Sequence, residues 1–546
     1  MRFLITALAF PIALITVLAG CSLEPNEDPE PEAEPSFCEQ HGWTERPFNR
    51  EGPYGEFRHS LAESFKVELH DGSEWKLRDH WSGCETVAIV TNRMRVSALD
   101  SSSTWESTED LAALVAGSPR NAYYLFITAS SSASAQAHQD DMQARIEEVL
   151  DDLDDEDRAW WEPRLLVVAE FVDDLDNWVE RVLDDDAGTG FLIDRLQQIR
   201  LYGNFADVTR YDPALANADA WPWRANLAYV THEVRASNFR SDRQDRLDAQ
   251  QDVTIVTAWE QEVLQGNTDT EVVFPDAGVM GEFDTLEIDL TMDCPDPEQG
   301  ESGHCGAWDY LSYIYLLEEG DAGEEDDTWM EMARFITTYH REGRYVVDAT
   351  PMLVYLAQGG ARTIRFDASS QSYLTTIDFR FRNADKGYAP SDATYLWGGR
   401  NFNEAYNTDR EAITVDIPAD ASRVEVRALI TGHGMADGNC AEFCNHQHEF
   451  TVGGETWLKD HPAIGNDTGC IDEIENGMTP NQGGTWWYGR GGWCPGQQVE
   501  PTIFDVTAAV EPGGSAEVSY RGLLGGNTPP PNSGNIRMSS WLVVYR

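Results

Sequence analysis

The chain has 546 residues and a formal net charge of −56, because 39 lysines and arginines face 95 aspartates and glutamates. A surface this acidic repels nucleic acid and anionic membranes, and no basic patch in the sequence offsets it. The length suggests three or four domains. Hydrophobic residues make up 41% of the chain, including 18 tryptophans, which is enough for large cores.

The first residues carry the features of a bacterial export signal. Arg2 supplies a positive charge, and residues 3–17 form an apolar run that is shorter than the roughly 20 residues of a membrane span. The run ends in Leu-Ala-Gly-Cys at residues 18–21, which resembles the lipobox of bacterial lipoproteins. We therefore expect a signal peptide over residues 1–20 and a lipid on Cys21, which places the mature protein on the outer membrane or cell surface.

The next segment, residues 21–37, has the composition of a tether. Its prolines alternate with glutamate and aspartate and leave no apolar surface to bury. Proline stiffness and charge repulsion keep such a segment extended. The lipid on Cys21 is thus the predicted contact with the membrane, and the rest of the chain is predicted to lie outside the cytoplasm.

Residues 38–250 are predicted to form an α/β accessory domain. Strands are expected at 65–69, 75–77, 86–90, 123–127 and 165–168, helices at 136–161 and 172–183, and a closing hairpin at 191–200. In arrangement alone, this order resembles thioredoxin-like and peroxiredoxin-like domains. No Cys-x-x-Cys follows the strand at 86–90, and Cys84 precedes it, so we expect no redox chemistry. An accessory domain of unrelated α/β fold is the alternative.

From about Val253 onward the helical patterns give way to short alternating strands. The clearest lie at 286–290, 313–316, 377–381, 424–430 and 541–545, separated by turns rich in Gly, Asn, Asp and Pro. This pattern is typical of antiparallel β-sandwiches. The stretch is too long for one sandwich, so we expect two, over residues 251–387 and 388–546.

The cysteines favour disulfides over metal. Nine cysteines less Cys21 leave an even number in an oxidising compartment. Six lie in close pairs, which we predict to be Cys294–Cys305, Cys440–Cys444 and Cys470–Cys494, and the remaining two, Cys38 and Cys84, could pair with each other. Zinc is the alternative, because Cys440, Cys444, His446 and His448 offer four candidate ligands. Neighbouring thiols in exported proteins usually oxidise, so we predict no metal and assign no role to His433, His446 or His448.

Four ordered segments of the C-terminal half resemble one known family. They are CP…CGAWD at 294–309, ARFITTY at 333–339, TGHG…CAEFC at 431–444 and GC…RGGWCPG at 469–496. Together they resemble the peptide-N-glycosidase F family, amidases that release N-glycans from asparagine. Over roughly residues 270–546, the resemblance implies two eight-stranded jelly rolls packed side by side.

The resemblance also implies a reaction and its acids. The reaction is hydrolysis of the amide between asparagine and the innermost N-acetylglucosamine, with N-glycoproteins or glycopeptides as substrates and no cofactor. Asp309 matches the primary catalytic carboxylate, and Glu442 matches a second acid that acts through a bridging water. Asp367 matches a third acid, for which the family usually has Glu. Such chemistry needs an activated water and a proton for the leaving nitrogen, which suits carboxyl groups in a partly dry cleft.

Three further residues match substrate contacts of the family. Arg490 and Trp493 correspond to substrate-binding positions, and Trp308, like Trp493, offers an apolar face to a sugar ring. One departure concerns Tyr310, because the best-known members have Arg after Trp-Asp.

That departure keeps a second function open, a catalytically silent surface lipoprotein that binds glycans or proteins. A third, a copper monooxygenase-like protein of the same fold, is the least favoured. It would need histidine clusters in both sandwiches, and the first sandwich has few histidines, namely His304 and His340.

Overall fold

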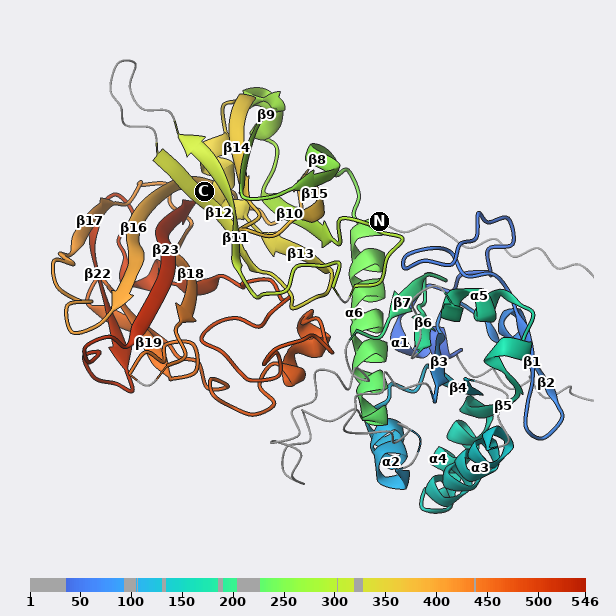
Figure 1. Cartoon of the computed structure of the whole chain (residues 1–546). Helices are drawn as coiled ribbons and strands as arrows, with labels where there is room; N and C mark the ends of the chain where they lie inside the picture. Colours follow the sequence, from blue (N-terminus) through green and yellow to red (C-terminus); the bar gives the residue numbers. More distant parts are fainter. Residues whose placement is uncertain are drawn as a thin grey trace, which may run out of the picture.

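The computed structural model describes residues 36–92, 105, 107–129, 134–184, 190–203, 226–301, 303–318, 328–436 and 438–546. The predicted signal peptide, Cys21 and nearly all of the tether at 21–37 lie outside these residues. In the described part, a five-stranded sheet and a small hairpin precede four antiparallel four-stranded sheets (Figure 1). No helix there is both long and apolar enough to cross a membrane. The predicted domain boundaries and location stay predictions.

The N-terminal sheet has the strand order β5-β4-β3-β6-β7. Strands β3, β4 and β5 are parallel, and β6 and β7 add in antiparallel fashion as a hairpin. Both faces of β3 and β4 are buried, as expected of parallel strands with continuous apolar runs. The strands are β1 (Lys66–Glu68), β2 (Glu74–Lys76), β3 (Thr86–Thr91), β4 (Ala122–Thr128), β5 (Leu165–Phe171), β6 (Gly190–Ile193) and β7 (Ile199–Leu201). The predicted alternation of strands and helices is present, and the thioredoxin-like assignment stays a prediction.

The helices of the N-terminal α/β part are shorter than the apolar periodicity of the sequence predicts. They are α1 (Phe37–His41), α2 (Thr108–Gly117), α3 (Ala135–Asp151), α4 (Asp155–Trp161) and α5 (Trp178–Asp184). The single helix predicted at 136–161 is therefore wrong, because the chain breaks between α3 and α4. The carboxylate of Asp154 accepts the N–H of Asp157 and starts a new helix there, as an N-cap aspartate does.

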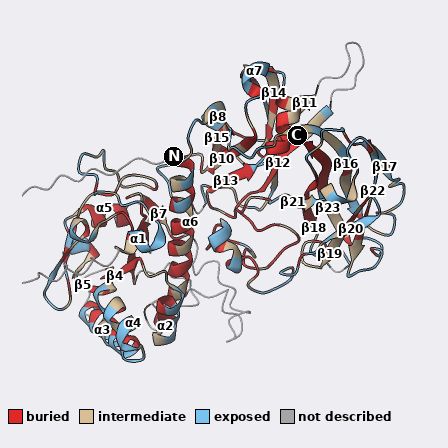
Figure 2. Ribbon diagram, turned by 180° about the vertical axis from the view of Figure 1, so that it is seen from behind, coloured by how far each residue is buried: buried red, intermediate tan, exposed pale blue. Residues whose placement is uncertain are grey.

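Helix α6 (Val230–Asp248) was not predicted and joins the two halves of the molecule. It stands between the N-terminal sheet and the β-sandwiches, and much of its surface is buried (Figures 1 and 2). Many of its buried residues are polar, including Glu233, Asn238 and Arg243. A helix buried against polar partners lacks the apolar stripe by which periodicity reveals a helix.

The first β-sandwich consists of the sheets β13-β10-β15-β8 and β12-β11-β14-β9. Ile288 and Phe379 of one sheet share a core with Ile314 and Phe366 of the other. Its strands are β8 (Thr254–Leu264), β9 (Asn267–Asp276), β10 (Thr285–Asp293), β11 (Leu311–Glu318), β12 (Thr328–Ile336), β13 (Gly343–Asp348), β14 (Gly359–Asp367) and β15 (Tyr373–Arg382), with the short helices α7 (Ala277–Met280) and α8 (Leu353–Leu356) between strands.

The second β-sandwich consists of the sheets β16-β23-β18-β21 and β17-β22-β19-β20. Its strands are β16 (Pro390–Phe402), β17 (Ile413–Asp416), β18 (Arg423–His433), β19 (His446–Val452), β20 (Glu455–Lys459), β21 (Thr502–Asp505), β22 (Ser515–Leu524) and β23 (Gly534–Tyr545). Trp541 and Val543 of β23 belong to the core of the first sandwich. The two sandwiches therefore pack directly on each other, as predicted.

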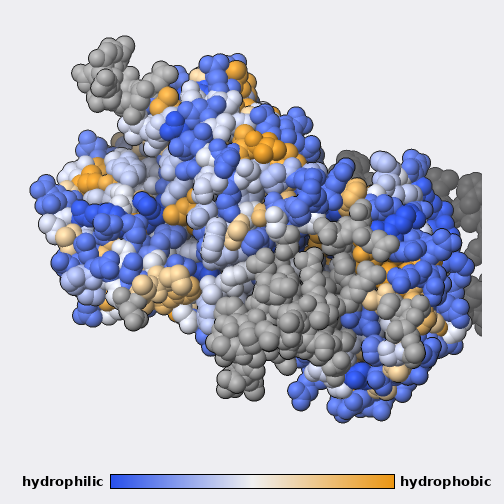
Figure 3. All heavy atoms as spheres, viewed as in Figure 1, coloured by the Kyte–Doolittle hydropathy of each residue, from blue (hydrophilic) through white to orange (hydrophobic). Residues whose placement is uncertain are grey.

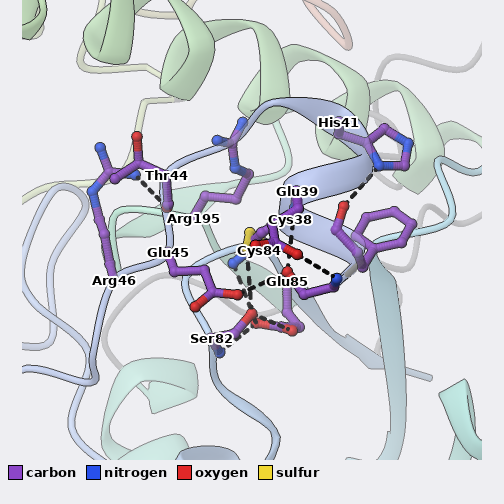
Figure 4. Close-up of a disulfide and its surroundings, with 12 residues drawn as sticks. Cys38, Glu39, His41, Thr44, Glu45, Arg46, Ser82, Cys84, Glu85 and Arg195 are labelled. Atoms are coloured by element: carbon purple, nitrogen blue, oxygen red, sulfur yellow. Dashed lines mark hydrogen bonds between the residues drawn. A yellow bond between two sulfur atoms is a disulfide. The ribbon is translucent and has the colours of Figure 1, made fainter. Parts of the chain in front are cut away.

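The predicted disulfides are confirmed. The bonds are Cys294–Cys305, Cys440–Cys444 and Cys470–Cys494, and Cys38 pairs with Cys84. The last bond ties α1 to the segment before β3, where Ser82 and Glu85 hydrogen-bond beside it at 2.8 Å (Figure 4). Because Cys440 and Cys444 are oxidised, the alternative zinc set that included them is excluded.

The surface in Figure 3 is mostly hydrophilic, with apolar residues in small separate patches. This distribution agrees with the large excess of acidic residues. Two of the exposed large apolar side chains, Trp308 and Tyr310, flank Asp309 in the sequence.

Candidate active site

Two carboxylates from different sandwiches meet at one arginine. Asp309 lies between the Cys294–Cys305 disulfide and β11, and Glu442 lies within the loop that Cys440–Cys444 closes. The Nη2 atom of Arg490 is 4.0 Å from Asp309 Oδ2, and its Nε donates to Glu442 Oε1 at 3.1 Å. The two predicted acids and the predicted arginine thus form one cluster at the junction of the sandwiches.

The guanidinium of Arg490 is held on all sides, and its side chain is 0% exposed. Besides Glu442, it donates to the carbonyl oxygen of Tyr488 at 3.1 Å and to the carbonyl and hydroxyl oxygens of Thr485 at 2.8 and 3.0 Å. The rings of Phe443 and Trp493 lie against it, 5.2 and 4.9 Å from its central carbon. Arg490 is therefore a fixed positive charge around which the two carboxylates are arranged.

Trp493 lies inside the protein rather than at the surface. It is 5% exposed, its indole N–H donates to the carbonyl of Gly432 at 2.9 Å, and its ring stacks on His433. In this arrangement it supports Arg490 and offers no open face to a sugar. Direct contact between Trp493 and substrate stays a prediction.

Trp308 differs from Trp493 in being 58% exposed. Its backbone is fixed, because its carbonyl accepts from the Thr337 hydroxyl at 2.7 Å and from the Gln371 amide at 2.9 Å. The neighbouring Tyr310 is anchored through its N–H, which donates to the Thr337 hydroxyl at 2.8 Å. Two exposed rings on a fixed backbone therefore flank Asp309.

Asp367 has a local contact instead of a place in the cluster. At the end of β14, its Oδ1 accepts the N–H of Ser369 at 2.9 Å, and its carbonyl accepts the Ser312 hydroxyl at 2.6 Å. Among the described residues, Asp367 is not one of the groups that shift the pKa of Asp309, whereas Tyr339 and Arg490 are. The structure shows a turn-closing aspartate, and its catalytic role stays a prediction.

Tyr339, to which the sequence pointed only as the end of ARFITTY, contacts Asp309 directly. Its hydroxyl donates a hydrogen bond to the Asp309 carboxylate. Its backbone N–H donates to Gln482 at 2.8 Å, and its ring lies where a Cβ on Gly484 would stand. The only sequence signal for Tyr339 is its place at the end of the ARFITTY segment, residues 333–339, which resembles the family.

Burial raises the pKa of both carboxyl groups. For Asp309, the Tyr339 hydrogen bond and the Arg490 charge act in the opposite direction. For Glu442, Arg490 again acts against burial, while the Asp309 charge raises the pKa further. Two neighbouring acids with raised pKa values can divide the roles of proton donor and proton acceptor.

A cavity of about 270 Å³ opens beside this cluster in the second sandwich. Arg490, Trp493, His461, Lys459 and Glu473 are among the residues that line it. The cavity therefore reaches Arg490, the arginine that holds Glu442.

Comparisons with known proteins point to one family. The model of the C-terminal region of peptide-N-glycosidase F matches residues 401–543. Peptide-N(4)-(N-acetyl-beta-D-glucosaminyl)asparagine amidase F of Elizabethkingia miricola is 23% identical in an alignment of 241 residues that covers 41% of this chain. That match spans 63% of the relative, slightly less than two thirds of its length.

Two solved structures are also similar. PNGase F, a glycosylasparaginase from Flavobacterium meningosepticum, is 19% identical with a TM-score of 0.42, over 54% of this chain and 96% of that one. PNGF-II is 12% identical with a TM-score of 0.40, over 54% of this chain and 65% of that one.

Proposed function

We propose that this chain, whose C-terminal half is peptide-N-glycosidase F-like, hydrolyses the amide bond between asparagine and the innermost N-acetylglucosamine of N-linked glycans. The observation that carries the proposal is the meeting of Asp309 and Glu442 at the buried guanidinium of Arg490. The amidase relatives lend support at the level of the family. N-glycoproteins or glycopeptides are then the substrates.

The reaction consumes one water and yields a glycosylamine and an aspartate on the peptide. The water must lose a proton as it attacks the amide carbon, and the leaving nitrogen must gain one. Asp309, beside the exposed ring of Trp308, is the carboxylate that we assign to the amide and the innermost sugar. Glu442 acts on the same centre through a bridging water.

Arg490 is a positioning group in this mechanism. It donates hydrogen bonds to Glu442, Tyr488 and Thr485 and places its charge 4.0 Å from Asp309, so it positions Glu442 and stabilises the carboxylate of Asp309. Direct contact between Arg490 and substrate stays a prediction. Its charge also limits how far burial raises both pKa values. Both acids can therefore still lose their protons.

Trp308 and Tyr310 provide the surface on which the sugar rests. Sugar rings have apolar faces that pack on aromatic rings, and these two side chains are exposed on either side of Asp309. We assign them to the mouth of the site. Tyr310 in place of the family's Arg then changes which glycans fit.

The same exposed rings favour one other function, a surface lipoprotein that binds glycans without cutting them. Binding requires Trp308 and Tyr310 but not the two acids. The amidase is preferred because a binding protein gains nothing from two partly buried carboxylates whose pKa values burial has raised.

The decisive experiment is incubation of the protein with a denatured N-glycoprotein, followed by mass analysis of the peptide. An amidase leaves aspartate at the former glycosylation site, whereas an endoglycosidase leaves one sugar on asparagine. Release with conversion to aspartate supports the proposal. Glycopeptide binding with no release would replace it with the binding function.

A further inference from the structure

Three buried histidines form a second cluster in the second sandwich, apart from the two acids. His446 and His448 stand two residues apart on β19, so their side chains point to the same face. His461 follows β20, the strand paired with β19. The three imidazoles are almost completely inaccessible to solvent.

One ring nitrogen of each histidine lies within 4.8 Å of one ring nitrogen of each of the others. His446 Nδ1 and His448 Nε2 are 2.7 Å apart, and the ring centres of His446 and His461 are 4.5 Å apart. The Nε2 atom of His461 is buried and has no hydrogen-bond partner. A buried polar atom without a partner is uncommon, and here it belongs to a cluster of metal-ligand type.

In His446 and His448, the ring nitrogen that does not face the other histidine faces an oxygen atom. His448 Nδ1 is 2.7 Å from the hydroxyl of Tyr520, which is itself 2.9 Å from the hydroxyl of Tyr406. His446 Nε2 faces the carbonyl of Ala441 without completing a hydrogen bond. A histidine that binds a metal through one nitrogen usually donates its other N–H to such an oxygen, which fixes the ring and its tautomer.

We infer that His446, His448 and His461 form a binding site for one first-row transition-metal ion of the kind that imidazole prefers, Zn²⁺ or Cu²⁺. The two cysteines that the sequence offers as further ligands, Cys440 and Cys444, take no part because they are joined in a disulfide. His461 completes the set instead, from a position that spacing does not reveal.

Binding requires a small movement. Two nitrogens held tetrahedrally at the usual Zn–N length lie roughly 3.3 Å apart, so the hydrogen bond between His446 and His448 opens as the ion enters. His461 also lines the cavity beside Arg490, which gives the ion a route from solvent.

The test is metal binding by the full chain after treatment with a chelator and desalting. We expect one Zn²⁺ or Cu²⁺ per chain by elemental analysis, and a higher melting temperature with the ion than without it. Bound Cu²⁺ would show nitrogen hyperfine structure in its electron paramagnetic resonance spectrum. The two ions are loaded separately, so the same experiment shows which is retained.

Substitutions separate a metal site from a hydrogen-bond network. His461→Gln should abolish retention of the ion, because it removes one of three ligands. The matched control is His232→Gln, since His232 is another buried histidine with an unpartnered nitrogen, on α6. Tyr520→Phe keeps the three ligands and should weaken binding about 10- to 100-fold.

Two results would overturn the inference. One is wild-type protein that retains neither ion and melts at the same temperature with and without them. The other is retention by His461→Gln equal to that of His232→Gln. Either would mean that the cluster is only a hydrogen-bonded chain from Tyr406 through Tyr520 and His448 to His446. If His461→Gln does not fold, the Cu²⁺ spectrum of the wild type decides, because a signal without nitrogen couplings also rejects the site.

Discussion

At the scale of single residues, the candidate site depends on the interactions of one arginine, Arg490, with two carboxylates. Arg490 pairs with Glu442 at 3.1 Å and approaches Asp309 at 4.0 Å. Both acids are partly buried, so each is held in a balance between burial, which favours the protonated form, and a positive charge, which favours the carboxylate. Small changes in this balance should be visible in the kinetics.

The first prediction concerns the loss of either acid. Asp309→Asn keeps the shape of the side chain but cannot exchange a proton, so activity on a glycopeptide should fall by about 10² to 10⁴-fold. Glu442→Gln should lower turnover less, since a water mediates its action. Asp367→Asn tests the predicted third acid and should have the smallest effect of the three. Glycopeptide affinity should survive in all three variants, and equal activity of Asp309→Asn and wild type would make Asp309 structural.

The second prediction concerns pH. The Tyr339 hydroxyl donates to the charged form of Asp309 and so lowers its pKa. Tyr339→Phe removes that bond, and the pKa of Asp309 should rise. The limb of the kcat/KM profile that reports Asp309 should therefore move to higher pH. Profiles that superimpose would show that Asp309 does not titrate in the reaction.

At the scale of elements, α6 is fixed to the sandwiches by a buried ion-pair network. Arg341, in the turn between β12 and β13, is 1% exposed and pairs with Glu233 of α6 at 2.5 Å and with Glu301 at 2.8 Å. It also donates to the carbonyls of Pro480 at 2.6 Å and Leu201 at 3.0 Å. One side chain thereby joins the N-terminal sheet, α6 and both sandwiches.

The third prediction follows from that network. Arg341→Met leaves two buried carboxylates without their cation, which should cost about 3–5 kcal/mol in the free energy of unfolding. Adding Glu233→Gln and Glu301→Gln should recover much of the loss. Arg521 pairs with Glu449 but is 58% exposed, so the control Arg521→Met should cost about 0–1 kcal/mol. Urea unfolding measures the free energy of unfolding of each variant. Equal losses of stability for Arg341→Met and Arg521→Met would contradict the role of the network.

At the scale of the whole molecule, the acidic ectodomain is predicted to be held at a membrane by its lipid alone. The full chain has a net charge of −56, and such an excess of acidic residues repels an anionic bilayer. The predicted tether at residues 21–37 would keep the folded part away from that surface. Substrate would then reach the candidate site from the external solution.

The fourth prediction tests this anchoring. Cys21→Ser removes the thiol that takes the lipid, so the protein should appear as unprocessed precursor or in the soluble fraction. The wild type should partition into detergent. Cell fractionation with an antibody against the ectodomain distinguishes the two, and unchanged membrane association of Cys21→Ser would reject the lipid anchor.

Much of the structure of the C-terminal half could be predicted from local sequence patterns alone. The alternation along 377–381 correctly predicted a strand with one buried face, because that period is a property of the strand itself. The close cysteine pairs correctly predicted three disulfides, since short separations bring thiols together whatever the rest of the fold. The adjacency of Trp308 and Asp309 likewise requires no tertiary information.

Contacts between distant residues were decided only by the tertiary structure. Arg490 lies between Asp309 and Glu442 because two sandwiches pack together, and the same packing buries Trp493. Helix α6 escaped prediction because its partners are largely polar, so no apolar stripe marks it. Burial and long-range charge set the pKa values of the acids, and both depend on which segments meet in space, which the local order of residues does not encode.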